Sequence, residues 1–379
     1  MPELREIIAQ EIKKRGPVTF ARFMEMALYY PEHGYYTRPE ITTGPAGDFY
    51  TGPDVHPAFG QSLARLFTKM WEILGRPERW ALVEYGPGTG RLARQILSFL
   101  QDHCSRAIKG LTYWNVEISP GFLTLQKQEL SSLCQLAGKI CWVRDASELP
   151  EKITGCIFSN ELVDSFPVHR VRQSETGLQE IYVNYRKDFF EEEGPLSTPL
   201  LDVYFSDEKI ILEPGQAAEV NLAARNWLQK VAEILKKGFL LTIDYGGTAS
   251  EIYSPLRPEG TLRCFFQHRL VSSPYENIGR QDITASVNFS SLIRWGEEFG
   301  LTSLGLFSQA KFLLEIGILD LLKTPVKDYC FNEKRTRDIL AIKKLLHPEV
   351  MGDAFRVLLQ SKGLPAITTR SLFRKNTAF

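Results

Sequence analysis

The sequence lacks the features that mark several large classes of protein. It carries no net charge, with 45 basic and 45 acidic residues among 379, whereas proteins that capture nucleic acid electrostatically usually carry a basic excess. It also contains no run of about 18 apolar residues, the length that spans a bilayer as a helix. We therefore expect no nucleic-acid partner and no membrane partner.

Cysteine is scarce and shows no pattern. None of the six cysteines has CxxC spacing, and several lie within apolar runs such as KICWV and GCIFS. This favours buried free thiols in a reducing cytoplasm over a disulfide framework or a zinc site, so we predict no metal. The first 16 residues mix acids with bases around an apolar stripe, which indicates an amphipathic helix and not a targeting peptide. We predict a cytoplasmic location.

From residue 80 onward, short apolar strands alternate with helical patterns. Strands are predicted at WALVEY, TYWNVEI, KICWV, GCIFSN and GFLLTIDYG, with helices after the first two and near residues 216–236. LTSLGLF and AFRVLLQ are candidates for two more strands near the end. This alternation indicates βαβ units and a parallel sheet covered by helices on both faces.

Three other stretches lie outside this alternation. Residues 1–78 have the pattern of two helices joined by a long loop rich in Gly, Pro, Tyr and Thr. Residues 170–215 alternate apolar and polar side chains in LQEIYVNYR and LLDVYFS, which favours an antiparallel hairpin or small sheet. Residues 246–290 favour an ordered loop over the sheet. We predict an N-terminal cap over 1–78 and a core over 79–379 that carries the other two stretches as insertions.

The strongest local signal is the stretch ALVEYGPGTGRL, which starts at residue 81. Gly86, Gly88 and Gly90 follow a predicted strand and precede a predicted helix, an arrangement that lets the backbone approach a ligand closely. A Walker A loop needs Lys followed by Ser or Thr after its last glycine. This chain has Arg91 and a leucine there, which excludes a phosphate loop.

Carboxylates accompany three successive strand ends. Glu84 precedes the glycines, where it would repel a pyrophosphate and attract a cationic ligand such as S-adenosylmethionine. Glu117 ends the second strand, in position to accept both hydroxyls of a ribose, and Asp145 follows the third, in position to accept from an adenine amino group. The spacing favours a methyltransferase over a nucleotide-dependent oxidoreductase or a cofactor-free binding fold.

Blocks of sequence from residue 47 to 289 resemble the MidA-type methyltransferases, the family that includes the mitochondrial complex I assembly arginine methyltransferase. The matching blocks are GDFYTGPDVHPAFG (47–60), VEYGPGTGRL (83–92), YWNVEISPGFLTLQ (113–126), FSNELVDSFPVHR (158–170), LLTIDYGG (240–247) and the stretch from TLRCFFQHR to QDITASVNF (261–289). The resemblance implies a class I α/β fold with a Rossmann-like, mostly parallel sheet and an antiparallel last strand. It also implies S-adenosyl-L-methionine as the cofactor and a cap made of the N-terminal helices and the insertions.

The resemblance also implies a cofactor contact from the cap loop. In this family the loop packs over the cofactor, which makes Asp48, Tyr50 and Thr51 candidate cofactor-binding residues, and we add Asn160 after the fourth strand. Glu161 and Asp164 follow Asn160 and are candidate catalytic residues, because two carboxylates can hold a planar guanidinium bidentately.

A hydroxyl acceptor would need a general base instead. His268 and Asp282 are the candidates for that role. Further candidates for substrate binding are His56, His169, Asp244 and Tyr245. We predict a bacterial-type, cytoplasmic methyltransferase that acts on protein arginine. The alternatives are O-methylation of a small molecule and a non-catalytic assembly factor, and a homodimer is left open.

Overall fold

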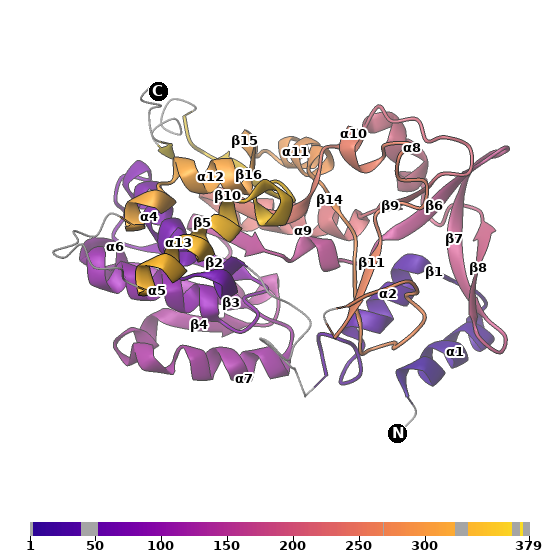
Figure 1. The fold of residues 1–379 in the computed structure, drawn as a ribbon, viewed down its shortest axis with the longest axis horizontal. Helices are drawn as coiled ribbons and strands as arrows, with labels where there is room; N and C mark the ends of the chain where they lie inside the picture. The colour runs from indigo at the N-terminus through magenta and orange to yellow at the C-terminus, as the bar shows by residue number, and fades with distance from the viewer. Residues whose placement is uncertain (1–2, 39–51, 268, 323–332, 366–371, 374–379) are drawn as a thin grey trace.

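The computed structural model describes residues 3–38, 52–267, 269–322, 333–365 and 372–373. In Figure 1 a larger lobe surrounds a central sheet, and a smaller lobe contains the N-terminal helices together with strands from the middle of the chain.

The helices are α1 (Leu4–Arg15), α2 (Phe20–Tyr29), α3 (Gly52–Val55), α4 (Ala58–Ile73), α5 (Arg91–His103), α6 (Ser105–Lys109), α7 (Pro120–Glu129), α8 (Pro199–Asp207), α9 (Leu222–Ile234), α10 (Ala249–Ile252), α11 (Phe289–Glu298), α12 (Gln309–Glu315) and α13 (Glu333–Leu346). Shorter helical turns are η2 (Ser131–Lys139), η3 (Ala146–Glu148), η4 (Val163–Ser165), η5 (Ile318–Leu322) and η6 (Pro348–Gly352). The strands are β1 (Val18–Thr19), β2 (Trp80–Tyr85), β3 (Leu111–Val116), β4 (Ile140–Val143), β5 (Ile153–Asn160), β6 (His169–Ser174), β7 (Gly177–Tyr185), β8 (Phe189–Gly194), β9 (Ala217–Val220), β10 (Leu235–Gly247), β11 (Arg263–Phe266), β12 (Arg269–Val271), β13 (Asp282–Thr284), β14 (Val287–Asn288), β15 (Thr302–Ser308) and β16 (Phe355–Lys362).

The main sheet has the strand order β15-β16-β10-β5-β2-β3-β4, and β14 pairs with β10 at one end. The strands from β10 to β4 pair in parallel, whereas β16 runs antiparallel to both β10 and β15. The predicted fold class, a mostly parallel sheet with an antiparallel last strand, is therefore confirmed. The order reverses at β2, which creates a crevice at the carboxyl ends of the neighbouring strands.

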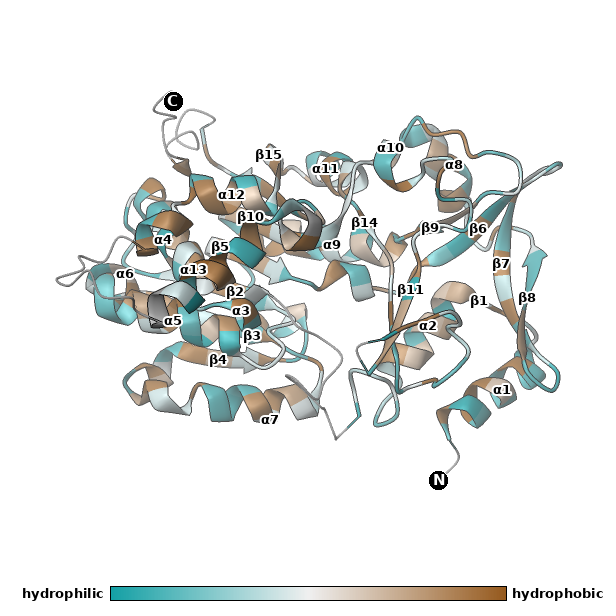
Figure 2. Ribbon diagram, viewed as in Figure 1, coloured by the Kyte–Doolittle hydropathy of each residue, from teal (hydrophilic) through white to brown (hydrophobic). Residues whose placement is uncertain are grey.

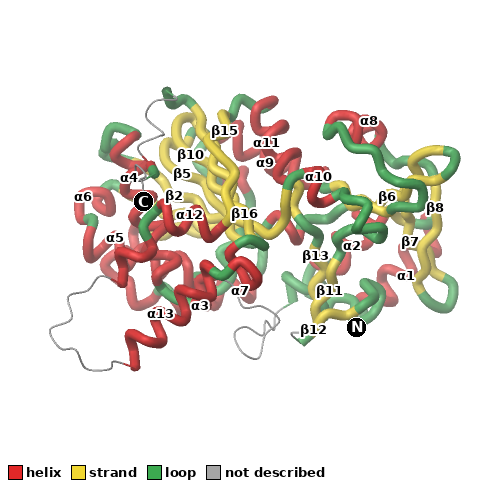
Figure 3. Tube along the Cα trace, turned by 45° about the horizontal axis from the view of Figure 1, so that its top comes forward, coloured by secondary structure: helices red, strands yellow, loops and turns green. Residues whose placement is uncertain are grey.

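Helices cover both faces of this sheet, as Figure 3 shows. Strand β2 is buried along its whole length, and its alternate side chains pack in opposite directions. Leu82 joins an apolar cluster with Phe67 of α4 and Phe158 of β5, whereas Val83 joins a second cluster with Leu228 of α9. Two-sided burial explains why the strand is apolar apart from Glu84.

The smaller lobe joins segments that are far apart in the sequence. Strands β1, β7, β6 and β9 form one antiparallel sheet, with β8 added to β7. Helices α1 and α2 pack on it through a cluster that includes Phe23, Met24 and Val183, and Ile283 of β13 joins the same cluster. Figure 2 shows hydrophobic and hydrophilic residues alternating along α1, and its buried side chains include Leu4 and Ile8. The division of the chain at residue 78 stays a prediction, and α4 packs with the main sheet.

Two local predictions are wrong. The segment LLDVYFS, expected to be extended, lies in helix α8, because Thr198 caps the helix and Pro199 occupies its first turn. Tyr204 and Phe205 are then buried on one side of that helix. The helix expected from residue 216 begins only at Leu222, after the cap residue Asn221, and residues 217–220 form strand β9.

The second insertion also contains more regular structure than the ordered loop that was predicted. It holds helix α10 and strands β11 to β14, and β11 pairs with both β12 and β13 in a small antiparallel sheet. These strands are short, so their apolar alternation is brief and the many glycines, prolines and serines around them dominate the sequence pattern.

Candidate functional site

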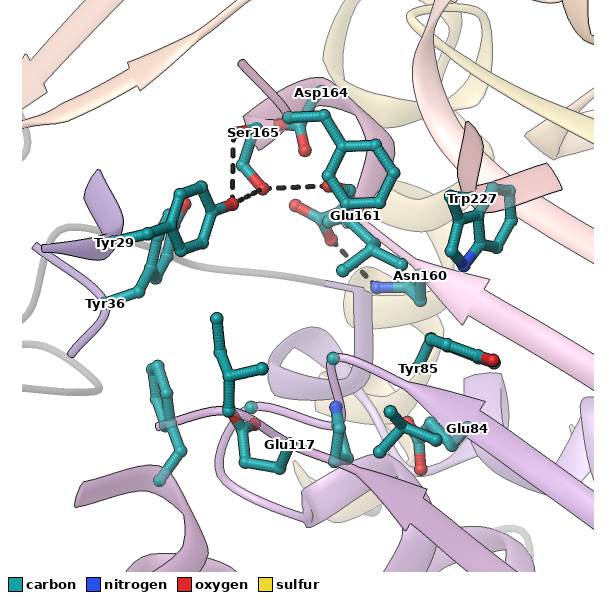
Figure 4. A pocket seen from close by; sticks show the side chains of 18 of the residues that line it. Tyr29, Tyr36, Glu84, Tyr85, Glu117, Asn160, Glu161, Asp164, Ser165 and Trp227 are labelled. Carbon is teal, nitrogen blue, oxygen red and sulfur yellow. Dashed lines mark hydrogen bonds between the residues drawn. The ribbon is translucent and has the colours of Figure 1, made fainter. Parts of the chain in front are cut away.

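A cavity of about 610 Å³ lies at the carboxyl ends of β2, β3 and β5, the edge at which open α/β sheets bind ligands. Its wall combines the turns after these strands with the turn after β4, one face of α9, and residues at the end of α2 and just beyond it. Figure 4 shows the labelled side chains around this space, with Tyr29 and Tyr36 on one side and Trp227 on the other.

The turn after β2 requires glycine for two separate reasons. Gly86, Gly88 and Gly90 have φ values of 64°, 53° and 81°, a region in which residues with a side chain are strained. A Cβ on Gly86 would lie 2.8 Å from Leu162 Cδ1, and a Cβ on Gly90 would lie 3.1 Å from the Cα of Gln126. A Cβ on Gly88 would meet no atom within 4 Å, and this glycine lines the cavity. The turn therefore leaves backbone open to a ligand at Gly88.

Glu84 lies beneath this turn and is almost fully buried. Tyr113 donates a hydrogen bond of 2.5 Å to Glu84 Oε2. Burial raises the pKa of Glu84 to about 7, although the bond from Tyr113 acts in the opposite direction. A cation in the cavity would favour the ionised carboxylate, as the sequence suggested.

Glu117, at the end of β3, is held by the start of the next helix. Its carboxylate accepts from the backbone N–H of Ser119 at 2.8 Å and from Gln126 Nε2 at 3.0 Å. Gln126 Nε2 also donates to the carbonyl of Gly88 at 2.8 Å, so one side chain joins the acid to the glycine turn. Burial raises the pKa of Glu117 to about 7. Gln126 was not among the predicted residues, because nothing distinguishes it in an exposed helical pattern.

Asp145 lines the same cavity after β4 but also has a structural task. Its carboxylate accepts from the backbone N–H of Ser147 at 2.9 Å, and with Glu148 it forms a capping box at the start of η3. These bonds hold the pKa of Asp145 below its ordinary value. The carboxylate is therefore ionised and fixed at the cavity wall. Its contact with adenine stays a prediction.

Glu161 follows β5 in a strained conformation. Its φ is 54°, unusual for a residue that is not glycine, and such strain often lies at functional sites. Its N–H donates to the carbonyl of Ile243 at 2.9 Å, and Asn160 donates to its Oε1 at 3.2 Å. Burial, and next the nearby charge of Asp244, raise the pKa of Glu161 to about 8. Both Asn160 and Glu161 line the cavity.

Asp164 lies three residues further along, in η4, and is only 7% exposed. Burial and the neighbouring carboxylates raise its pKa well above the ordinary range. Apart from the backbone N–H of Ser165, no described residue donates to its carboxylate, which lines the cavity. Glu161 and Asp164 thus place two carboxylates on one short turn beside the space that a ligand can enter.

Asp244 supports this turn from below and does not line the cavity. Its Oδ2 accepts the backbone N–H groups of Leu162, Val163 and Asp164 at 3.1, 2.8 and 3.4 Å, and Oδ1 accepts that of Tyr245 at 2.9 Å. Burial raises the pKa of Asp244 to about 7. Backbone N–H groups thus donate to both oxygens of the carboxylate. Asp244 is therefore a positioning residue, which holds the turn that carries Glu161 and Asp164.

The other predicted residues that the structure describes lie outside the cavity wall. Asp282 is buried in β13 and accepts from Tyr36 Oη at 2.7 Å, and the Tyr245 ring packs against Phe355 with centroids 6.2 Å apart. His56 Nε2 lies 3.2 Å from an oxygen of Asp338, and His169 Nδ1 lies 2.7 Å from one of Glu180 in the smaller lobe. Asp48, Tyr50, Thr51 and His268 lie outside the described residues.

The cavity wall also contains residues that were not predicted from the sequence, among them Tyr29, Tyr36, Ser165 and Trp227. The tyrosines come from the segment LYYPEHGYY, whose density of tyrosine was the available signal. Across the described part of the chain, no helix is long and apolar enough to cross a membrane, and no three or more His, Cys, Asp or Glu residues are grouped to hold a metal ion.

The doubly covered sheet, the open glycine turn and the acids at the strand ends define the class of S-adenosylmethionine-dependent methyltransferases. Residues 62–307 match the model of such a family, and the chain belongs to that family of S-adenosyl-L-methionine-dependent methyltransferases. The protein is thus an S-adenosylmethionine-dependent methyltransferase.

Proteins with similar sequences align with most of the chain. The mitochondrial protein arginine methyltransferase NDUFAF7 of Rattus norvegicus is 29% identical, over 93% of this chain and 83% of the relative. Its counterpart in Homo sapiens is 27% identical, over 93% and 82%. A solved candidate methyl transferase from Burkholderia thailandensis, bound to S-adenosylhomocysteine, is 30% identical with a TM-score of 0.86, over 99% of this chain and 96% of that one.

The cavity fits the cofactor of this family. Two buried carboxylates, Glu84 and Glu117, line it and suit a ligand with a sulfonium, an ammonium and ribose hydroxyls. The space above Gly88 is free for close backbone approach. When bound, the cofactor supplies a methyl group on a positively charged sulfur. The chain's own residues must hold the acceptor, exclude water and take up a proton.

Proposed function

We propose that the protein transfers a methyl group to the guanidinium of an arginine in another protein. The observation that carries this proposal is the pair Glu161 and Asp164, two carboxylates on one short turn in the same cavity as the cofactor turn. The names of the relatives from Rattus norvegicus and Homo sapiens, both protein arginine methyltransferases, support the same acceptor.

The turn suits a planar cation because its two carboxylates have no basic partner among the described residues, although Glu161 accepts a hydrogen bond from Asn160. Among the described residues that line the cavity, the basic side chains are Arg38, Arg91, Arg144 and Lys230. Arg91 forms an ion pair with Asp54, and Lys230 lies near Asp145. No ion pair of a described basic residue with Glu161 or Asp164 exists. An entering guanidinium would neutralise this pair and gain two charge-assisted hydrogen bonds.

Glu161 also has the properties of a proton acceptor. Burial and the charge of Asp244 raise its pKa to about 8, so the carboxylate binds a proton readily near neutral pH. In the proposed reaction Glu161 orients the guanidinium nitrogen and accepts the proton that this nitrogen loses. Asp164 holds the second nitrogen, and Asp244 keeps both acids in place through the backbone.

O-methylation of a small molecule is less well supported. The histidine base that we expected for a hydroxyl acceptor is not found in the described part of the cavity wall, since His56 and His169 are engaged elsewhere in the described structure. His268 lies outside the described residues, so its part in the reaction stays a prediction. The contact of Asp48, Tyr50 and Thr51 with the cofactor stays a prediction for the same reason.

Incubation with methyl-labelled cofactor and host lysate tests the acceptor. We expect label in the protein fraction, and acid hydrolysis should release it as methylarginine. Label in the small-molecule fraction, or in a protein residue other than arginine, would exclude the proposal. The Glu161→Gln variant is the control for transfer by other enzymes in the lysate.

We further propose a cytoplasmic, bacterial-type protein. Five cysteines in the described residues are free thiols, which fits a reducing compartment. The relatives named above as protein arginine methyltransferases are mitochondrial, so cell fractionation with an antibody against this chain is the direct test.

A further inference from the structure

The acceptor side of the cavity has an aromatic wall that the proposed function does not yet use. Tyr29, at the end of α2, and Tyr36 stack with ring centroids 5.5 Å apart and an interplanar angle of 25°. Both rings line the cavity. Figure 4 shows them beside the turn that carries Glu161 and Asp164.

Each ring is fixed by its hydroxyl to an element of the acceptor site. Tyr29 Oη donates to the carbonyl of Ser165 at 3.1 Å and lies 3.0 Å from its Oγ. Tyr36 Oη donates to Asp282 Oδ1 at 2.7 Å. Asp164 directly precedes Ser165 in the chain, and its carboxylate is near Asp282. The two hydrogen bonds therefore fix both rings relative to Asp164.

The wall has the chemistry to contact a cation. Burial raises the pKa of both phenols above the ordinary value, so they stay neutral, and the face of a neutral aromatic ring carries partial negative charge. A delocalised guanidinium stacks on such a face, whereas an ammonium is a compact, strongly hydrated charge. The cap already contains one contact of this kind, since the guanidinium carbon of Arg38 lies 4.8 Å from the centre of the Tyr35 ring.

We propose that Tyr29 and Tyr36 determine acceptor specificity, by stacking against the planar cation that Glu161 and Asp164 hold and so selecting arginine over lysine. The inference rests on the proposed function, because it assigns the second wall of the same acceptor site. The carboxylates supply charge, which arginine and lysine share. The rings supply a flat surface, which only the guanidinium matches.

Competition by two small probes separates the contributions of charge and shape. Labelled methyl transfer to lysate protein is measured with increasing N-acetylarginine amide or N-acetyllysine amide, which gives an inhibition constant for each. We expect Tyr29→Leu and Tyr36→Leu to weaken inhibition by the arginine probe about tenfold and to leave inhibition by the lysine probe within about twofold. Tyr29→Phe and Tyr36→Phe keep the ring and should retain the preference for the arginine probe.

Tyr30→Leu is the matched control, because Tyr30 is a neighbour that does not line the cavity. Binding of S-adenosylhomocysteine and the thermal unfolding curve show whether each variant keeps its fold. If the leucine variants retain the wild-type ratio of the two inhibition constants, or lose affinity for both probes equally, the inference is wrong and the proposed function stands. If the wild type labels no protein arginine at all, the proposed function itself fails.

Discussion

The two sides of the cavity are built in different ways. The cofactor side comes from β2, β3 and the turns that follow them, a stretch that runs from Glu84 to Gln126. The acceptor side joins α2, the turn after β5 and, through Asp244 and Asp282, strands β10 and β13. The segments next to single strands, including the one with Glu161 and Asp164, leave motifs in the sequence, whereas the distant segments that complete the acceptor side do not.

The charges on the two sides also differ in their partners. Glu84 and Glu117 each accept hydrogen bonds from side chains that fix them before any ligand binds. Glu161 accepts a single side-chain hydrogen bond, from Asn160, and burial together with nearby carboxylates such as Asp244 raises the pKa of both Glu161 and Asp164. The cofactor side is prepared in advance, whereas the acceptor side is completed by the charge of its ligand.

The largest expected effect lies on the cofactor side. In Gly88→Val the new side chain would fill the space above the turn, and a β-branched residue is strained at a φ of 53°. We expect affinity for S-adenosylhomocysteine, measured by calorimetry, to fall more than about 100-fold. Gly75→Val is the control, since Gly75 also has positive φ and open space around its Cβ. If both variants lost affinity for S-adenosylhomocysteine equally, the loss would come from damage to the fold and not from the cofactor turn.

On the acceptor side, Glu161→Gln removes the charge and the proton acceptor while keeping the shape. We expect kcat to fall at least about 100-fold, with affinity for S-adenosylhomocysteine within about threefold of wild type. Glu25→Gln makes the same change at another cavity residue, one that pairs with Arg22, and should leave kcat nearly unchanged. Full activity of Glu161→Gln would contradict the arginine clamp.

Asp244 should affect the fold as well as the reaction. The carboxylate of Asp244 accepts hydrogen bonds from backbone N–H groups. In Asp244→Asn an amide NH₂ replaces one of the two oxygens, so that a donor would face a donor. We expect the free energy of unfolding in urea to fall by roughly 2–3 kcal/mol. Asp202→Asn, at an exposed position, should change it by less than about 0.5 kcal/mol. A wild-type value for Asp244→Asn would show that these bonds are not needed to hold the turn.

A smaller effect is expected from pH. The pKa of Glu161 is raised to about 8, and only its ionised form holds a cation. The value of kcat/KM for the acceptor should therefore fall at least about tenfold for each pH unit below that value, and more steeply where Asp164, whose pKa is also raised, must be ionised too. The pKa values of Glu84 and Glu117 are also raised. The assay is therefore run at saturating cofactor, so that their protonation does not change the fraction of enzyme with cofactor bound. A flat profile between pH 6 and 8 would show that Glu161 does not titrate in this step.

Sequence reasoning succeeded where one short segment determines the structure. The strands of the main sheet and the glycine turn were predicted, because short apolar runs bounded by turn residues indicate buried strands and closely spaced glycines indicate a turn with positive φ. The prediction for LLDVYFS was wrong, because a capping threonine and a proline before this segment favour a helix over a strand. Sequence reasoning also missed Tyr29 and Tyr36, because a tyrosine in a helix or loop has the same local pattern in a core and in a site.

By itself, the sequence determined the fold class, through the alternation of strand and helix patterns along the chain. It also indicated the methyl donor and singled out Glu84, Gly88 and Glu117, each of which lies in a single strand or the turn that follows it. Only the tertiary structure decided that Asp244 supports the turn after β5 instead of lining the cavity, and that Tyr29 and Tyr36 form part of the cavity wall. The physical reason is that hydrogen bonding and burial depend on which distant segments meet. The pairing of β10 with β5 brings Asp244 to the turn, and the contact of α2 with the same turn brings Tyr29 to Ser165.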